Sequence, residues 1–309
     1  MMMTASAWLA GFAVLGIIAL SIWLYEPDKP RAALQRTYPG QYRIVEGVRL
    51  RLRDTGPPDA QAVIMLHGFG ASLDTWEEWA NALSTRYRVV RFDLPGFGLT
   101  GPDPTGDYTD ARTMQILIGL LDQLDLDRVS LIGNSLGGRI AWNFAAMHPD
   151  RVARLVLVSP DGFASPGFEY DKLPETPLIM RALPYTAPRS MLKANLAAAY
   201  GNPEALSEDN VTRYHDMMLA PGVRQAILAR MGQVILRDPG PTLGRIHAPT
   251  LLLWGEKDGM IPITNADDYL RYLPNVTLVR LPGLGHLPFE EEPVRSLAPI
   301  DLFLSAGMH

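Results

Sequence analysis

A serine stands between glycines at residues 133–137, where the sequence reads Gly-Asn-Ser-Leu-Gly. The apolar run before it has the composition of a buried strand, and the run after it has that of a helix. A serine hydroxyl becomes a nucleophile when a tight turn holds it exposed beside a base. Gly133 and Gly137 lack a Cβ and so tolerate a crowded backbone. We therefore expect Ser135 to be a catalytic nucleophile.

The serine needs a base, and His286 has the placement for one. It lies in a glycine-lined loop, LPGLGHLP, after the last predicted strand, where it can reach the carboxyl edge of a sheet. We expect His67 to stabilise a loop. The remaining histidines are expected to be solvated or to cap elements: His148, His215, His247 and His309.

The histidine needs an acid to orient it, and we favour Asp258, which stands at the end of the strand-like run 249–258. The order Ser135, Asp258, His286 is the one that a nucleophile on a strand-to-helix turn requires. Two alternatives stay open. Glu256 leaves the same strand two residues earlier, and Asp161 follows the preceding strand.

The amides of Leu136 and Phe69 are the expected oxyanion hole. The first begins a helix, and the second lies in the turn LHGFG, after a predicted strand. Phe69 would also line the substrate pocket. The sequence has no H-E-x-x-H, phosphate loop or dinucleotide fingerprint, so we expect no metal and no cofactor.

These residues fall at the ends of alternating strand-like and helix-like segments. Short apolar runs ending in Gly, Pro or Asp are typical of buried parallel strands, and amphipathic segments between them predict helices. The alternation predicts a doubly wound, mostly parallel sheet. The strands are expected at 48–54, 62–68, 87–96, 128–134, 153–162, 249–258 and 276–285, and the helices at 72–84, 110–124 and 136–148.

About 85 residues separate two of these strands, far more than an ordinary connection. They contain helical segments, the last of them 222–237, in which Val223, Ile227, Met231, Val234 and Ile235 repeat at helical spacing. We expect a helical cap over the carboxyl edge of the sheet.

The N-terminus differs in kind, because residues 7–25 carry no charge and would span roughly 28 Å as a helix. We expect an uncleaved single-pass membrane anchor rather than a cleaved signal peptide and export, since no Lys or Arg precedes the run. Lys29, Arg31 and Arg36 follow it, which places the catalytic part in the cytoplasm.

The bulk composition excludes several classes of protein. The chain has 309 residues, 47% hydrophobic residues, a net charge of −5 and no cysteine. It therefore has no disulfide and no thiolate chemistry. No basic stripe is present, so we expect no nucleic-acid partner. The oligomeric state is left open.

The segments LHGFGASLDTW, RFDLPGFGLT, GNSLGGRIAWNFAAMHPDRVARLVLVSP, LLLWGEKDGMIP and GLGHLPFEEEP together resemble the capped serine branch of the α/β-hydrolase superfamily. With an anchor added, the similarity is to membrane-anchored monoacylglycerol-lipase-like carboxylesterases. It implies an eight-stranded sheet and a structural role for 93–98. The expected division is an anchor (1–26), a linker (27–40), a core (41–160 and 246–309) and a cap (161–245).

The resemblance implies hydrolysis of a small-molecule ester, with an apolar acyl or aryl group, through an acyl-enzyme. The alternatives are a C–C hydrolase of meta-cleavage products, which usually has Trp where Leu287 stands, a cofactor-free perhydrolase, and a non-catalytic binding module. The expected substrate contacts are Phe69, Asn134, Met180, Met217, Met218 and Leu287, although packing alone also accounts for apolar residues of the cap.

Overall fold

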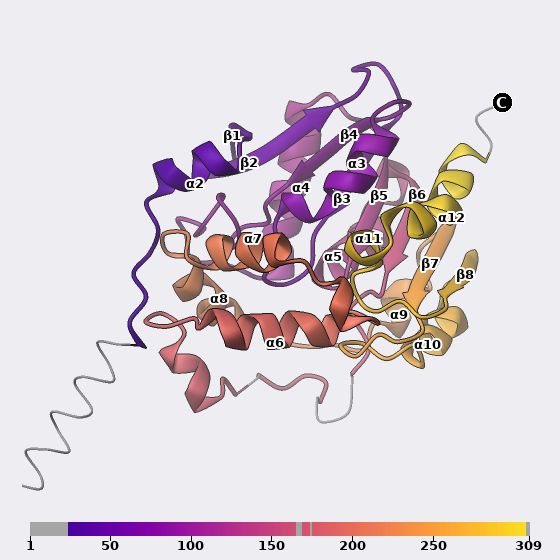
Figure 1. The fold of residues 1–309 in the computed structure, drawn as a ribbon. Helices are drawn as coiled ribbons and strands as arrows, with labels where there is room; N and C mark the ends of the chain where they lie inside the picture. Colours follow the sequence, from indigo (N-terminus) through magenta and orange to yellow (C-terminus); the bar gives the residue numbers. More distant parts are fainter. Residues whose placement is uncertain (1–23, 165–168, 174, 307–309) are drawn as a thin grey trace, which may run out of the picture.

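A computed structural model describes residues 24–164, 169–173 and 175–306. Its centre is an eight-stranded sheet in the order β1-β2-β4-β3-β5-β6-β7-β8. The pairs β1–β2 and β2–β4 are antiparallel, and all the other neighbouring pairs in this order, from β4–β3 to β7–β8, are parallel (Figure 1). The strands are β1 (Gln41–Val45), β2 (Val48–Thr55), β3 (Ala62–Leu66), β4 (Arg88–Phe92), β5 (Val129–Asn134), β6 (Val152–Val158), β7 (Thr250–Gly255) and β8 (Val276–Leu281).

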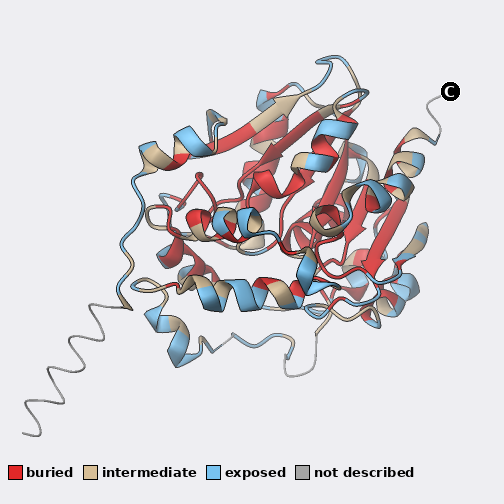
Figure 2. Cartoon of the chain, in the orientation of Figure 1, coloured by how far each residue is buried: buried red, intermediate tan, exposed pale blue. Residues whose placement is uncertain are grey.

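Helices cover both faces of the sheet, because the central strands are apolar on both sides. In β3, Ile64 packs in one apolar cluster with α4 and α5, while Val63 and Met65 pack in the other with α3 and α12. Figure 2 shows the buried strands between these layers. The core helices are α3 (Glu77–Leu83), α4 (Asp110–Gln123), α5 (Leu136–Met147), α10 (Asn265–Tyr272), α11 (Pro288–Glu291) and α12 (Pro293–Ser305).

The insertion between β6 and β7 is helical, as expected. Figure 1 shows α6, α7 and α8 together across one end of the sheet. Its helical elements are η3 (Leu178–Ala182), α6 (Arg189–Ala199), η4 (Pro203–Ala205), α7 (Glu208–Met218), α8 (Val223–Met231) and α9 (Gly240–Leu243).

The expected helix over 222–237 is wrong in its second half, because α8 ends at Met231. Gly232, a poor helix former, follows, and the Gln233 side chain then binds another segment. It accepts from the Tyr108 amide and donates to the Gly106 carbonyl. These contacts pull 233–236 away from the helix axis, so Ile235 is exposed instead of continuing the apolar stripe.

The stretch before β1 is bound to the insertion. It contains α2 (Arg31–Thr37), which the sequence analysis did not expect in the linker. Lys29 and the Tyr38 hydroxyl both bind the Asp216 carboxylate on α7, and Asp28 pairs with Arg224 on α8. The predicted anchor lies almost wholly outside the described residues, and no helix within them is long and apolar enough to cross a bilayer.

The backbone is crowded where β3, β5 and α5 meet. A Cβ on Gly133 would lie 2.3 Å from the Gly137 carbonyl oxygen, and one on Gly137 would lie 2.0 Å from the Leu66 carbonyl oxygen. Both atoms belong to backbone held by the sheet or by the helix, so neither contact can relax by a side-chain rotation. Only glycine at both positions lets α5 start directly against the sheet.

Gly137→Ala is expected to lower the free energy of unfolding by about 2–3 kcal/mol, since the added methyl overlaps β3 backbone. Gly232→Ala is the matched control. Its Cβ would be 3.6 Å from the nearest atom, and its φ is −83°, so a change within about 0.5 kcal/mol is expected. Urea unfolding measures both. Equal stability of the two variants would contradict this account of the turn.

Candidate active site

Ser135 occupies the turn between β5 and α5 in an unfavourable backbone conformation, with φ 53° and ψ −117°. Its amide donates to the Val158 carbonyl at 3.1 Å, and its own carbonyl accepts from the Asp161 amide at 3.0 Å. These bonds to the end of β6 hold a non-glycine residue at positive φ, a feature found where side chains are presented for function. Ser135 itself is only half-buried.

His286 and Asp258 form a direct pair. His286 Nδ1 donates to Asp258 Oδ2 at 2.7 Å, and both side chains are buried. The other carboxylate oxygen, Oδ1, accepts from the amides of Met260 and Ile261 at 2.8 and 2.9 Å. The carboxylate therefore has a fixed orientation, and it holds the imidazole in the tautomer whose Nε2 is free to accept a proton.

The two alternative acids lie elsewhere. The Asp161 carboxylate pairs with Arg139 at 3.0 Å, and its backbone carbonyl accepts from Trp142 and Tyr269. The side chain of Glu256 is exposed. Asp258 is thus the one of the three carboxylates that the fold brings to His286.

Two backbone amides beside Ser135 have no partner in the described part of the chain. Neither the Phe69 amide nor the Leu136 amide donates to a protein acceptor there. A Cβ on Gly68 would lie 3.3 Å from Ser135 Cβ, so the Phe69 turn passes close to the serine. Free amides at this place suit a developing oxyanion.

His67 holds that turn in place. The Leu94 amide donates to His67 Nε2 at 2.9 Å, so the proton is on Nδ1, which lies 2.8 Å from the Gly68 carbonyl oxygen. Burial lowers the pKa of the His67 imidazole, which keeps it neutral. The structural role expected from the sequence agrees with this arrangement.

Asn134 has contacts that sequence reasoning missed. Its side chain is buried, and Nδ2 donates to the carbonyls of Val158 at 3.1 Å and His286 at 3.2 Å. It therefore joins the serine turn to the histidine loop rather than presenting its amide to a pocket. Within the described residues no hydrogen bond joins Ser135 Oγ to His286 Nε2. Catalytic hydrogen bonds are often long without a substrate.

The other expected substrate contacts differ in exposure. Phe69 is 48% exposed, and Met180 and Met218 are half-buried. Met217 is buried in one apolar cluster, in agreement with packing of the insertion against the core, and Leu287 is buried in the other.

A carboxylate near the histidine loop was also missed. Glu290 accepts from Tyr200 and Tyr214 hydroxyls and pairs with Arg213, so it joins α11 to the insertion. Burial and the Glu290 charge raise the pKa of the Tyr214 hydroxyl, so it stays a donor. No spacing rule predicts this cluster, because Glu290 lies more than 70 residues along the chain from each of its three partners.

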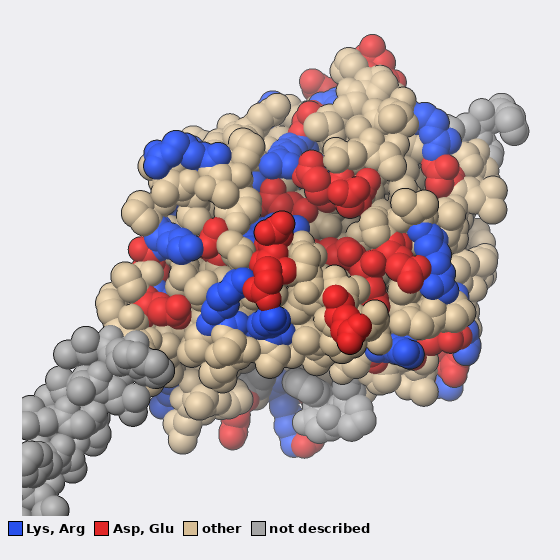
Figure 3. All heavy atoms as spheres, viewed as in Figure 1, with Lys and Arg blue, Asp and Glu red and all other residues tan. Residues whose placement is uncertain are grey.

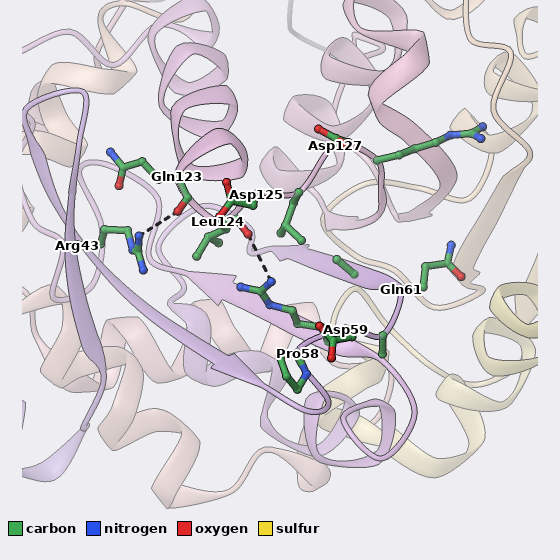
Figure 4. A pocket seen from close by; sticks show the side chains of 13 residues that line it. Arg43, Pro58, Asp59, Gln61, Gln123, Leu124, Asp125 and Asp127 are labelled. Carbon is green, nitrogen blue, oxygen red and sulfur yellow. Dashed lines mark hydrogen bonds between the residues drawn. The ribbon is translucent and has the colours of Figure 1, made fainter.

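A surface hollow lies at the other end of the sheet, where β3 and β5 begin (Figure 4). Two of its three arginines are bound within the protein. Arg43 donates to the Gln123 carbonyl, and Arg88 pairs with Asp54.

On the face drawn in Figure 3, basic and acidic side chains are interspersed. The described residues contain no group of three or more potential metal ligands.

Comparisons with known proteins agree with this architecture. A family profile described as "alpha/beta hydrolase fold" matches residues 61–293. An uncharacterized protein of Mycobacterium tuberculosis is 29% identical over 85% of this chain and 80% of its own length. A 2-hydroxy-6-oxononadienedioate/2-hydroxy-6-oxononatrienedioate hydrolase of Paraburkholderia xenovorans is 33% identical over 72% of this chain and 79% of its own length.

Among solved structures, a bacterial membrane phospholipase A superposes with a TM-score of 0.74 at 24% identity. The match covers 97% of this chain and 98% of that one. At this identity the likeness concerns the fold.

Asp258→Asn is expected to lower kcat for p-nitrophenyl butyrate by about 10³–10⁴-fold, because an amide stabilises the wrong imidazole tautomer. Asp161→Asn is the control and should retain most of the activity, since its carboxylate serves Arg139. Initial rates of ester hydrolysis and thermal unfolding are measured for both variants and compared with the wild-type chain. A larger loss in Asp161→Asn would show that the histidine is oriented by that acid instead.

Proposed function

Because this chain belongs to the α/β-hydrolase family, we propose that it is a serine hydrolase that cleaves carboxylic esters through an acyl-enzyme. One observation carries the proposal. Ser135 is held at positive φ near two amides that have no acceptor among the described residues, and the same end of the sheet carries the His286–Asp258 pair.

Each group has a defined part in the reaction. Ser135 Oγ attacks the ester carbonyl while His286 Nε2 takes its proton, and Asp258 stabilises the imidazolium through Nδ1–H. The amides of Phe69 and Leu136 bind the oxyanion. His286 then returns the proton to the leaving alcohol, and the acyl group stays on Ser135. Water, deprotonated by His286, attacks the acyl-enzyme and releases the acid.

C–C bond hydrolysis is the second candidate. It is favoured by the relative from Paraburkholderia xenovorans, whose name describes a hydrolase of a 2-hydroxy-6-oxo acid. Against it, Leu287 follows the histidine where that group usually has Trp. Ester hydrolysis uses the serine, base and oxyanion amides without a further requirement, so it stays the first proposal.

We also propose that the enzyme is held at a membrane and acts on apolar esters. Residues 7–23 are uncharged. The described chain begins at residue 24, and exposed apolar side chains lie near this point. The Glu26 amide donates to the Tyr185 carbonyl, which places Tyr25 near Tyr185. Figure 2 shows the neighbouring exposed helical turn at the lower left. The exposed apolar residues of this region are Tyr25, Leu178, Ile179, Tyr185 and Met191.

A series of p-nitrophenyl esters from acetate to laurate tests the proposed reaction with the full chain in detergent. Turnover should peak at medium or long acyl chains and vanish in Ser135→Ala. Activity that survives in Ser135→Ala, or an optimum at acetate, would contradict the proposed nucleophile or the proposed apolar substrate, respectively. No ester turnover but cleavage of a 2-hydroxy-6-oxodienoate would select C–C hydrolysis.

Alkaline carbonate extraction tests the membrane proposal. The full chain should stay in the membrane pellet, and mass spectrometry should find its N-terminal region intact. Release into the supernatant, or a new N-terminus near residue 26, would contradict an uncleaved anchor.

A further inference from the structure

Five arginine side chains in the described part of the chain are almost fully buried: Arg51, Arg91, Arg139, Arg224 and Arg230. The first four each pair with a carboxylate, at 2.7–3.1 Å. No described carboxylate lies within 4 Å of Arg230. Arg230 Nη2 donates to Thr113 Oγ1 at 3.3 Å, and its Nε and Nη1 have no partner. Arg230 thus differs from every other buried arginine described.

A buried guanidinium without a counterion is costly to keep in a folded protein. Burial lowers the pKa of Arg230 to about 10, which still leaves the group charged at neutral pH. The Asp110 carboxylate is nearby, but it pairs with Arg139 at 3.1 Å. The ring of Phe97, 5.4 Å from the guanidinium carbon, provides a cation–π contact and no hydrogen-bond acceptor. The structure therefore holds a positive charge whose hydrogen-bonding capacity is largely unused.

Arg230 is close to the proposed oxyanion hole. It lies on α8, which packs on the loop after β4, since a Cβ on Gly96 would be 3.5 Å from Ala226 Cβ. The Phe97 ring beneath the guanidinium also contacts the Phe69 ring edge-on, with centroids 5.3 Å apart. The Phe97 ring thus lies between Arg230 and Phe69, whose neighbour Gly68 passes close to Ser135. An anion beside this ring would belong to a molecule bound at the active site.

We propose that Arg230 binds an anionic group of the substrate, a carboxylate or a phosphate, beside the Phe97 ring. Both groups accept charge-assisted hydrogen bonds from a guanidinium. This inference rests on the proposed function and narrows it. The preferred ester carries a negative charge as well as an apolar part.

Matched substrate pairs test the inference and separate the two anions. The carboxylate arm compares the mono-p-nitrophenyl ester of glutaric acid with p-nitrophenyl pentanoate, which has the same number of acyl carbons. The phosphate arm compares 1-hexanoylglycerol 3-phosphate with 1-hexanoylglycerol. In at least one arm the wild-type chain should prefer the charged ester in kcat/KM. Arg230→Met should remove about 10- to 100-fold of that preference and leave neutral-ester turnover nearly unchanged.

Thermal unfolding separates an anion-binding arginine from a structural one. Arg230→Met should leave Tm unchanged or raise it, since it removes an unpaired buried charge. Arg224→Met is the control on the same helix. Arg224 is equally buried but pairs with Asp28 at 2.8 Å, so its loss should lower Tm. A fall of Tm in Arg230→Met as large as in Arg224→Met would overturn the proposal, as would a wild-type chain with no preference in either arm.

Ligand binding keeps this inference distinct from the proposed reaction. If no ester is cleaved, glutarate and inorganic phosphate remain usable probes. One of them should raise the Tm of the wild-type chain and not that of Arg230→Met. No turnover together with such a shift would reject the esterase proposal and keep the anion site. Turnover of neutral esters, with no preference for the charged esters and no shift in Tm, would keep the esterase proposal and reject the anion site.

Discussion

The site depends on the close approach of three backbones, those of β3, β5 and α5. The carbonyl of Leu66 lies where a Cβ on Gly137 would be, and the first turn of α5 lies where a Cβ on Gly133 would be. This contact lets the helix begin directly at Ser135 and forces that residue to positive φ. The Leu136 amide, at the first residue of α5, has no acceptor in the described part of the chain. The proposed nucleophile and the proposed oxyanion donor on Leu136 therefore both depend on one packing constraint.

Both the core and the insertion bind the loop that carries His286. From the core, Asn134 donates to the His286 carbonyl, and Asp258 accepts from Nδ1. From the insertion, the Ala199 carbonyl accepts from the His286 amide at 2.6 Å. Glu291 accepts from the amides of Gly285 and Gly201, which joins the loop to the end of α6. The position of the proposed base, His286, therefore depends on the position of the insertion relative to the core.

Local sequence patterns predicted β2 to β8 and the helices α3, α4 and α5, but not β1, α10, α11 or α12, and they put Ser135, Asp258 and His286 after predicted strands. Apolar runs that end in turn residues mark parallel strands, and polar residues after such strands meet at one edge. The end of α8 was not predictable in this way, because Gln233 leaves the helix to bind residues 106–108. The contacts of Asn134, Glu290 and Arg230 were equally hidden. These contacts join segments that are far apart in the chain. Hydrophobic periodicity also gives no sign that Arg230 is a buried charge without a carboxylate partner.

Covalent labelling of Ser135 tests the central claim most directly. The folded full-length chain would be treated with a fluorophosphonate, digested and mapped by mass spectrometry. The account predicts a single adduct on Ser135, lost in Ser135→Ala and formed much more slowly in His286→Gln. No adduct on a folded chain, or labelling of another residue at the same rate in Ser135→Ala, would contradict it.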